Sequence, residues 1–267
     1  MTPNAHRAGT AEAAARAGGE VALDLFRSDL AIERKTDKTD VVTRADREAE
    51  TAVLDAIRAE FPDDPVVAEE SNGDAAVPEE GPAWVVDPID GTNNFVREIP
   101  VWATAVAALE DGEPVAAAVV LPALGDAYVA DGTGARLNGD VTAVSDRTDV
   151  DTFSVTPTVW WDRTRREEYA AATGEIVHRF GDLVRFRSAQ ATLSMVASGA
   201  LDATFTNRTP NAWDSVAGAF LVTEAGGTVT DLDGEPWRHD SRGLVVSNGQ
   251  RHDEVLAAAR AVDDARE

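Results

Sequence analysis

Short apolar runs alternate with turn sequences between residues 65 and 144. The runs are rich in valine and alanine and are short, which is typical of β-strands. Turns such as Asp111-Gly112 and Asn138-Gly139 separate several of them. This pattern predicts an antiparallel meander with strands at residues 66–68, 84–86, 103–106, 115–121 and 127–129.

Two segments before this region predict helices. The first spans residues 5–30, is alanine-rich, and contains Gly18-Gly19, which we expect to interrupt it. The second begins at Thr43-Arg44-Ala45-Asp46, a capping-box-like start, and ends near Phe61-Pro62. Residues 33–40 between them are polar without apolar periodicity and predict a loop. Both helices would cover the meander.

Strands and helices alternate after residue 151. The sequence predicts strands at residues 153–159, 183–186, 203–206, 228–230 and 244–246, and helices at residues 163–173, 191–198, 213–225 and 253–262. Alternation of this kind indicates an α/β layer. We therefore divide the chain into an N-terminal part of helices and antiparallel sheet, residues 1–147, and a C-terminal α/β part, residues 148–267.

Two carboxylates follow the apolar run that ends at Val86. Asp87 and Asp90 stand three positions apart beside a proline, directly before Gly91 and Thr92. Carboxylates, water and phosphate oxygens are the ligands that Mg²⁺ prefers. If the chain turns helical at Gly91 and Thr92, their N–H groups can bind an anion. The stretch therefore predicts adjacent metal and phosphate sites.

The chain carries three acidic motifs: Asp87-Pro88-Ile89-Asp90-Gly91-Thr92, the upstream Glu69-Glu70-Ser71 and the downstream Trp213-Asp214-Ser215-Val216-Ala217-Gly218. Together they resemble the inositol monophosphatase family. The family comprises Mg²⁺-dependent, lithium-sensitive phosphomonoesterases. The resemblance covers nearly the whole chain and implies an α+β or α/β fold, a layered αβαβα sandwich of the sugar phosphatase type.

The resemblance also implies which residues hold metal. Asp87 would bridge two Mg²⁺ ions, with Glu69 and the carbonyl of Ile89 completing the first site, while Asp90 and Asp214 hold the second. A third, weaker ion is implied near a loop that contains Lys35 and Asp40. Two or three Mg²⁺ ions per active site are therefore expected.

Catalytic and substrate contacts follow from the same resemblance. Thr92 and Asp46 would orient the nucleophilic water, and Glu70 would act close to the metal or through a water. The residues expected to contact substrate are Asp90, Gly91, Thr92, Asn93, Ala191, Asn207 and Arg208.

The substrate is left open by departures from the family pattern. Asn207 stands where inositol-preferring members have an acidic residue, and a usual glycine is missing from residues 185–192. Inositol 1-phosphate remains the first candidate. Arg208, with Arg185 and Arg187, could instead contact the second phosphate of fructose 1,6-bisphosphate. Phosphatases of 3′-phosphoadenosine 5′-phosphate usually carry a lysine after the Asp-Gly-Thr segment, which this chain lacks. A regulatory module that binds metal and phosphate without turnover is the non-enzymatic alternative.

The charge balance restricts the partners. The chain has 48 acidic and 24 basic residues, a net charge of −24, and only two lysines, Lys35 and Lys38. Dispersed acidity of this size indicates adaptation to a salt-rich, halophilic cytoplasm, and it disfavours nucleic-acid binding, which needs a basic surface. The 267 residues include no cysteine, no apolar run long enough to span a bilayer and no visible signal peptide. We expect a cytoplasmic protein with no membrane partner, a small phosphate ester as substrate and, from the resemblance, a homodimer.

Overall fold

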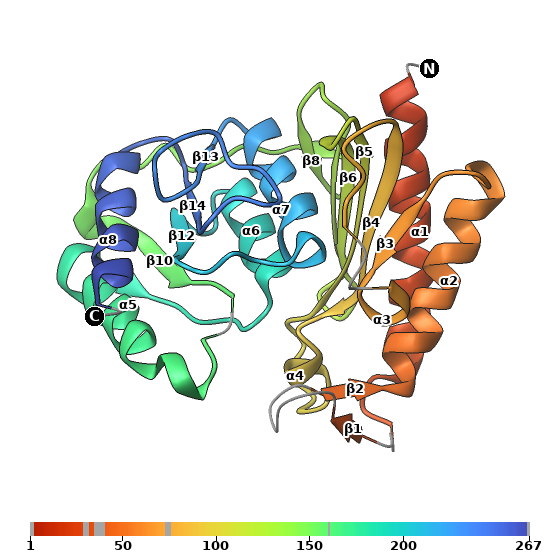
Figure 1. The fold of residues 1–267 in the computed structure, drawn as a ribbon, viewed down its shortest axis with the longest axis horizontal. Coiled ribbons are helices and arrows are strands. Elements are labelled where there is room, and N and C mark those ends of the chain that lie inside the picture. Colours follow the sequence, from red (N-terminus) through yellow and green to blue (C-terminus); the bar gives the residue numbers. More distant parts are fainter. Residues whose placement is uncertain (1–2, 29–31, 35–40, 73–75, 160, 266–267) are drawn as a thin grey trace.

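The computed structural model describes residues 3–28, 32–34, 41–72, 76–159 and 161–265 (Figure 1). A seven-stranded sheet forms the N-terminal part, with its strands in chain order. The first pair is parallel, so the expected antiparallel pairing is wrong for the strand at residues 66–68. Each later pair is antiparallel, which confirms the expected meander for the other strands. Its strands are β3 Val66–Ala68, β4 Pro82–Asp90, β5 Ala103–Glu110, β6 Glu113–Leu121, β7 Asp126–Ala130, β8 Ala135–Leu137 and β9 Asp140–Val141.

Two long helices, α1 (Pro3–Leu25) and α2 (Arg44–Glu60), cover one face of this sheet (Figure 1). The expected interruption at Gly18-Gly19 is wrong, because α1 runs through both residues. A β-carbon on Gly18 would lie 2.4 Å from Val53 Cγ2, and one on Gly19 would lie 2.7 Å from Pro122 Cγ. The glycines therefore allow close packing of α1 against α2 and the sheet.

A mixed five-stranded sheet forms the C-terminal part, in the order β11-β10-β12-β14-β13. β10 pairs in parallel with β11 and β12, whereas β14 is antiparallel to both of its neighbours. The strands are β10 Ser154–Pro157, β11 Asp182–Leu183, β12 Ala203–Thr206, β13 Thr228–Thr230 and β14 Leu244–Ser247.

Helices α6 (Ala189–Ala197) and α7 (Ala212–Glu224) lie between the two sheets, and α5 (Arg166–Arg179) and α8 (His252–Asp264) cover the outer face of the smaller sheet (Figure 1). The order of layers is αβαβα, so the predicted fold class is confirmed. Alternate residues of the large sheet, such as Val85 and Val86, enter different apolar clusters. Because helices cover both faces, its central strands are mainly apolar, with Asp87, Asp90 and Thr104 as buried exceptions.

Several element boundaries differ from those expected. Residues 32–34 and 41–43 pair as β1 (Ile32–Arg34) and β2 (Val41–Thr43), so residues 33 and 34 of the expected loop belong to a strand. Lys35 and Asp40 lie outside the described residues. The helix expected at residues 163–173 is a 3₁₀ turn, η2 (Arg163–Arg165), followed by the longer α5. A second 3₁₀ turn, η1 (Val150–Thr152), precedes β10.

The main correction concerns β4. Its expected end at Val86 is wrong, because the strand continues to Asp90 with an irregular register against β5 between Asp87 and Asp90. Proline is tolerated in strands at such irregularities, and the carbonyl of Pro88 accepts a hydrogen bond from Thr104 Oγ1 at 2.8 Å. Both aspartates are thus carried by one rigid strand. Among the described helices, none has the length and apolar character needed to cross a bilayer.

Candidate active site

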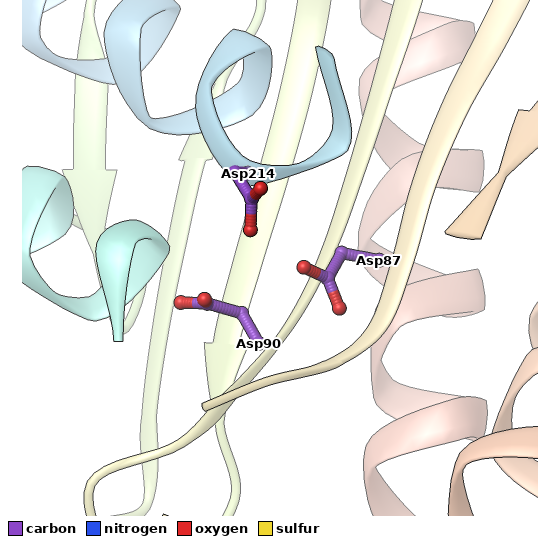
Figure 2. A group of neighbouring side chains, drawn as sticks. All are labelled: Asp87, Asp90 and Asp214. Atoms are coloured by element: carbon purple, nitrogen blue, oxygen red, sulfur yellow. The ribbon is translucent and has the colours of Figure 1, made fainter. Parts of the chain in front are cut away.

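Three carboxylates converge where β4 ends and α7 begins. Asp87 and Asp90 extend from β4, and Asp214 from the first turn of α7 (Figure 2). One oxygen from each lies within 4.8 Å of the others. The structure therefore brings together carboxylates from two of the three motifs, which are separated by more than a hundred residues of chain.

Asp87 is almost fully buried, with 1% of its surface exposed. Its Oδ1 atom is buried and has no hydrogen-bond partner among the described residues. Burial raises the pKa of this carboxyl, and the nearby charges of Glu69, Asp90, Asp214 and Asp46 raise it further. A buried carboxylate among other carboxylates is unfavourable unless a cation joins it. The all-oxygen donor set fits a hard divalent cation such as Mg²⁺.

Asp90 is held by the start of α6. Its Oδ2 accepts hydrogen bonds from Ser188 Oγ at 2.5 Å and from the N–H of Gln190 at 2.6 Å, while its Oδ1 accepts from the N–H of Ala189 at 3.1 Å. Burial raises the pKa of Asp90, and these hydrogen bonds partly offset that effect. The carboxylate orientation is therefore set by a helix from the C-terminal part of the chain.

Asp214 is half-buried in the first turn of α7. Asn211 Nδ2 donates to its Oδ2 at 2.8 Å, and Ser215 Oγ donates to the carbonyl of Asn211 at 2.7 Å. Carboxylates are favoured in the first turn of a helix, where backbone N–H groups are oriented towards them. The turn thus fixes Asp214 at the edge of the carboxylate group.

Thr92, which follows the turn at Gly91, contacts α2 through its side chain. Its hydroxyl lies 3.2 Å from Asp46 Oδ1 and 3.1 Å from the carbonyl oxygen of Ile89. Asp46 is fully buried in the first turn of α2. A carboxylate and a hydroxyl at this separation can jointly orient a water molecule. The sequence prediction had paired these two residues.

Gly91 supplies the turn between β4 and the short helix α4 (Thr92–Phe95). Its φ of 95° lies in the left-handed region that favours glycine. A β-carbon there would approach Ser188 Cβ to 3.1 Å and the carbonyl oxygens of Arg187 and Val101 to 3.4 Å. Asn93 is the half-buried second residue of α4. The tight turn directly follows Asp90, the last residue of β4.

Glu69 and Glu70 begin α3 (Glu69–Asn72), directly after β3. Glu69 is near enough to raise the pKa of Asp87. The N–H of Glu70 donates to Glu50 Oε2 at 2.8 Å, and Glu50 is 4% exposed. Sequence reasoning missed Glu50. It follows Asp46 by four residues, which places both on one face of α2, and this spacing could have revealed it.

Two expected substrate contacts, Asn207 and Ala191, are buried in the structure. Asn207 is 1% exposed, and its amide is engaged by Trp161 Nε1 at 2.8 Å and by Glu168 Oε2 at 2.5 Å. Ala191 is fully buried, and its N–H donates to Ser188 Oγ at 3.2 Å. Both side chains are enclosed by the protein in the structure, and their roles as substrate contacts stay predictions.

Arg208 remains close to the carboxylates. Its side chain is half-buried, and its Nη1 atom lies 4.0 Å from Asp162. Burial and Arg165 lower the pKa of Arg208, whereas the charges of Asp162, Glu168 and Asp214 oppose that shift. Arg185 is also half-buried, and burial lowers its pKa while Tyr169 and Asp90 oppose the change. The two guanidinium groups are thus within electrostatic reach of the site.

Comparison with known proteins agrees with this geometry. A sequence model of the inositol monophosphatase family matches residues 4–263. A fructose-1,6-bisphosphatase/inositol-1-monophosphatase of Thermotoga maritima is 36% identical over 239 residues, covering 86% of this chain and 87% of the relative. A histidinol-phosphatase of Mycobacterium tuberculosis is 36% identical over 244 residues, covering 87% of this chain and 89% of the relative.

A solved structure has the same fold. The IMPase of Thermotoga maritima superimposes with a TM-score of 0.84 at 32% identity, over 94% of this chain and 95% of that chain. The likeness spans both sheets and the helices between them, and therefore includes the elements that carry the three carboxylates.

Proposed function

Because the chain belongs to the inositol monophosphatase family, whose members are phosphoric monoester hydrolases, we propose that it is a Mg²⁺-dependent phosphatase of small sugar or polyol phosphates. Inositol 1-phosphate is the first candidate substrate. The supporting observation is the buried Asp87 carboxylate, which has an unpartnered oxygen among the described residues and faces Asp90 and Asp214. The family is metal-dependent, and a divalent cation among these carboxylates would offset their mutual repulsion.

We assign the metal ligands as the family pattern implies. Asp87 would join two Mg²⁺ ions, Glu69 and the carbonyl of Ile89 would contact one, and Asp90 and Asp214 the other. Bound Mg²⁺ would supply positive charge that neutralises the phosphate dianion in the transition state. Lys35 and Asp40 remain a proposal for a third ion.

The chain's own groups would hold the reactants. Asp46 would accept a hydrogen bond from the attacking water and receive its proton, while Thr92 Oγ fixes the position of that water. Glu70 would hold a further water at the edge of the site. The N–H groups of Gly91, Thr92 and Asn93 would bind phosphate oxygens, because three successive donors in a tight turn suit an anion.

Fructose 1,6-bisphosphate is the second candidate. With Asn207 buried, the expected contact to an inositol hydroxyl is missing, whereas Arg208 is within electrostatic reach of Asp214. A guanidinium there would bind a second phosphate by charge-assisted hydrogen bonds. The name of one relative, histidinol-phosphatase, points to histidinol phosphate as a substrate of that protein. This compound carries an ammonium group that Arg208 would repel.

Phosphate release in molar KCl with Mg²⁺ tests these alternatives. We would compare kcat/KM for inositol 1-phosphate, fructose 1,6-bisphosphate, histidinol phosphate and 3′-phosphoadenosine 5′-phosphate. Arg208→Gln should reduce kcat/KM for the bisphosphate more than for inositol 1-phosphate, while Arg136→Gln on the exposed β8 changes neither. Equal losses for both substrates would remove Arg208 as a specificity contact. No turnover of any ester would favour the binding module.

The remaining assignments rest on composition and family likeness. We infer a halophilic, cytoplasmic homodimer, in which the net charge of −24 is screened by salt. Acidic surfaces of this kind are expected to lose stability in dilute buffer.

A further inference from the structure

Gln190 connects the supports of two carboxylates in the candidate active site. Its backbone N–H donates to Asp90 Oδ2 at 2.6 Å. Its side-chain Nε2 donates to the carbonyl of Trp213 at 2.6 Å, and its Oε1 accepts from the N–H of Gly218 at 2.8 Å. Trp213 directly precedes Asp214. One residue of α6 is therefore bonded both to the Asp90 carboxylate and to the turn that carries Asp214.

The Gln190 side chain is fully buried, and both ends of its amide are used. Burying an amide is costly unless its donor and acceptor are satisfied. A satisfied buried amide fixes one relative position of the two segments it joins, because any shift breaks both bonds.

Helices α6 and α7 pack closely around the hydrogen bonds of the Gln190 side chain. A β-carbon on Gly218 would lie 2.5 Å from Leu193 Cβ and 2.9 Å from Gln190 Oε1. Gly218 is therefore needed to let the two helices approach closely. The close contact holds the amide in place and transmits its position to the first turn of α7.

We propose that Gln190 is a positioning residue that fixes the separation of Asp90 and Asp214 and thereby sets the affinity of the site for divalent metal. The inference rests on the metal site assigned under the proposed function. Gln190 belongs to the segment of residues 185–192 in which the sequence departs from the family pattern.

Other side chains cannot replace this one. Asparagine is one methylene shorter and cannot reach both α7 groups, glutamate has no donor for the Trp213 carbonyl when ionised, and methionine fills the space without either hydrogen bond. Gln190→Met therefore removes both side-chain hydrogen bonds to α7 while keeping the backbone hydrogen bond to Asp90 and most of the side-chain volume.

The test measures binding of the metal alone. Metal-free protein in 1 M KCl is titrated with MnCl₂ by calorimetry, since Mn²⁺ takes the same oxygen ligands as Mg²⁺. Gln190→Met should bind Mn²⁺ about tenfold more weakly, the loss typical when a group that orients a metal ligand is removed. Half-saturating Mg²⁺ for phosphate release should rise by about the same factor, with kcat at saturating Mg²⁺ much less affected. Gln250→Met, at an exposed position before α8, is the matched control.

Each outcome decides the proposal. A folded Gln190→Met protein with wild-type Mn²⁺ affinity would overturn it, as would a fall in kcat with unchanged metal dependence, which indicates a general structural role. If Gln190→Met does not fold, Gln190→Asn keeps a polar amide and serves in its place. A wild-type protein that binds Mn²⁺ but hydrolyses no ester would refute the proposed function and leave the calorimetric comparison intact.

Discussion

Ser188 and Asp90 lie 98 positions apart in the chain, and Ser188 Oγ donates a hydrogen bond to Asp90 Oδ2 at 2.5 Å. Ser188 is also the N-cap of α6, where its Oγ accepts the N–H of Ala191. The same hydroxyl therefore begins a helix of the middle layer and orients a carboxylate of the large sheet. The carboxylate group is complete only when both parts of the fold have docked.

Removal of the buried Asp87 charge should raise the stability of the metal-free protein and abolish its activity. In EDTA, Asp87→Asn should raise the melting temperature by about 2–4 °C for each kcal/mol of relieved repulsion, because the uncompensated carboxylate faces four others. In Mg²⁺ the variant should hydrolyse no phosphomonoester. Asp55→Asn makes the same charge change on the exposed face of α2 and controls for net charge. A drop in melting temperature in EDTA would contradict the assigned repulsion.

The hydroxyl of Thr92 should act on turnover and not on binding. Thr92→Ala removes the group that lies 3.2 Å from Asp46 Oδ1, so kcat should fall about a hundredfold or more while substrate KM changes little. Thr92→Ser keeps a hydroxyl at the same position and should recover most of kcat. Steady-state phosphate release distinguishes the two variants, and equal losses in both would indicate that the methyl group is what matters.

Crowding at Gly91 should be separable from backbone strain. Gly91→Ala and Gly139→Ala both force alanine into a left-handed conformation, which costs roughly 1–2 kcal/mol. Only at Gly91 does the new β-carbon meet Ser188, since the space around Gly139 is open. Gly91→Ala should lose more stability in urea than Gly139→Ala, because only it adds crowding to the backbone strain, and only Gly91→Ala should show a raised substrate KM. An unchanged KM would remove this turn from the phosphate site.

His252 should make stability depend on pH. Its ring nitrogens contact Ser247 Oγ at 2.8 Å and Thr230 Oγ1 at 2.9 Å. Burial lowers the pKa of His252 below its usual 6.5 in the folded state. The unfolded chain therefore binds more protons in this range, so the free energy of unfolding should decline as the pH falls through 6.5 towards the folded pKa.

Urea titrations at pH 7.5 and 5.5 measure that decline. His252→Gln should reduce the difference between the two pH values, whereas His178→Gln on the exposed side of α5 should preserve it. If the difference persists in His252→Gln, another group is responsible.

Local patterns predicted much of the fold. The bounds of β12 and β13 match the strands predicted at residues 203–206 and 228–230, because these short threonine-containing strands are delimited by turn residues next to them in sequence. The three carboxylates were also predictable, since Asp87 and Asp90 are near neighbours and the third motif resembles that of a known family. Their roles as ligands remain predictions.

What the sequence could not supply were contacts between distant segments. Gly18-Gly19 has the composition of a helix break, yet packing against Val53 and Pro122 makes glycine necessary inside α1. Asn207 is polar and next to Arg208, yet Trp161 and Glu168 hold it in the interior. In each case, tertiary contact decided between two readings that local sequence permits equally.

The most direct test of the metal-dependent site is hydrolysis of a generic phosphomonoester, 4-nitrophenyl phosphate, by metal-stripped protein as Mg²⁺ is added in molar KCl. We expect no turnover in EDTA, saturable activation by Mg²⁺ in the wild type and in Asp55→Asn, and at least about a hundredfold loss of kcat/KM in Asp90→Asn. Turnover that persists in EDTA, or that survives in Asp90→Asn, would contradict the assignment of this carboxylate group as the catalytic centre.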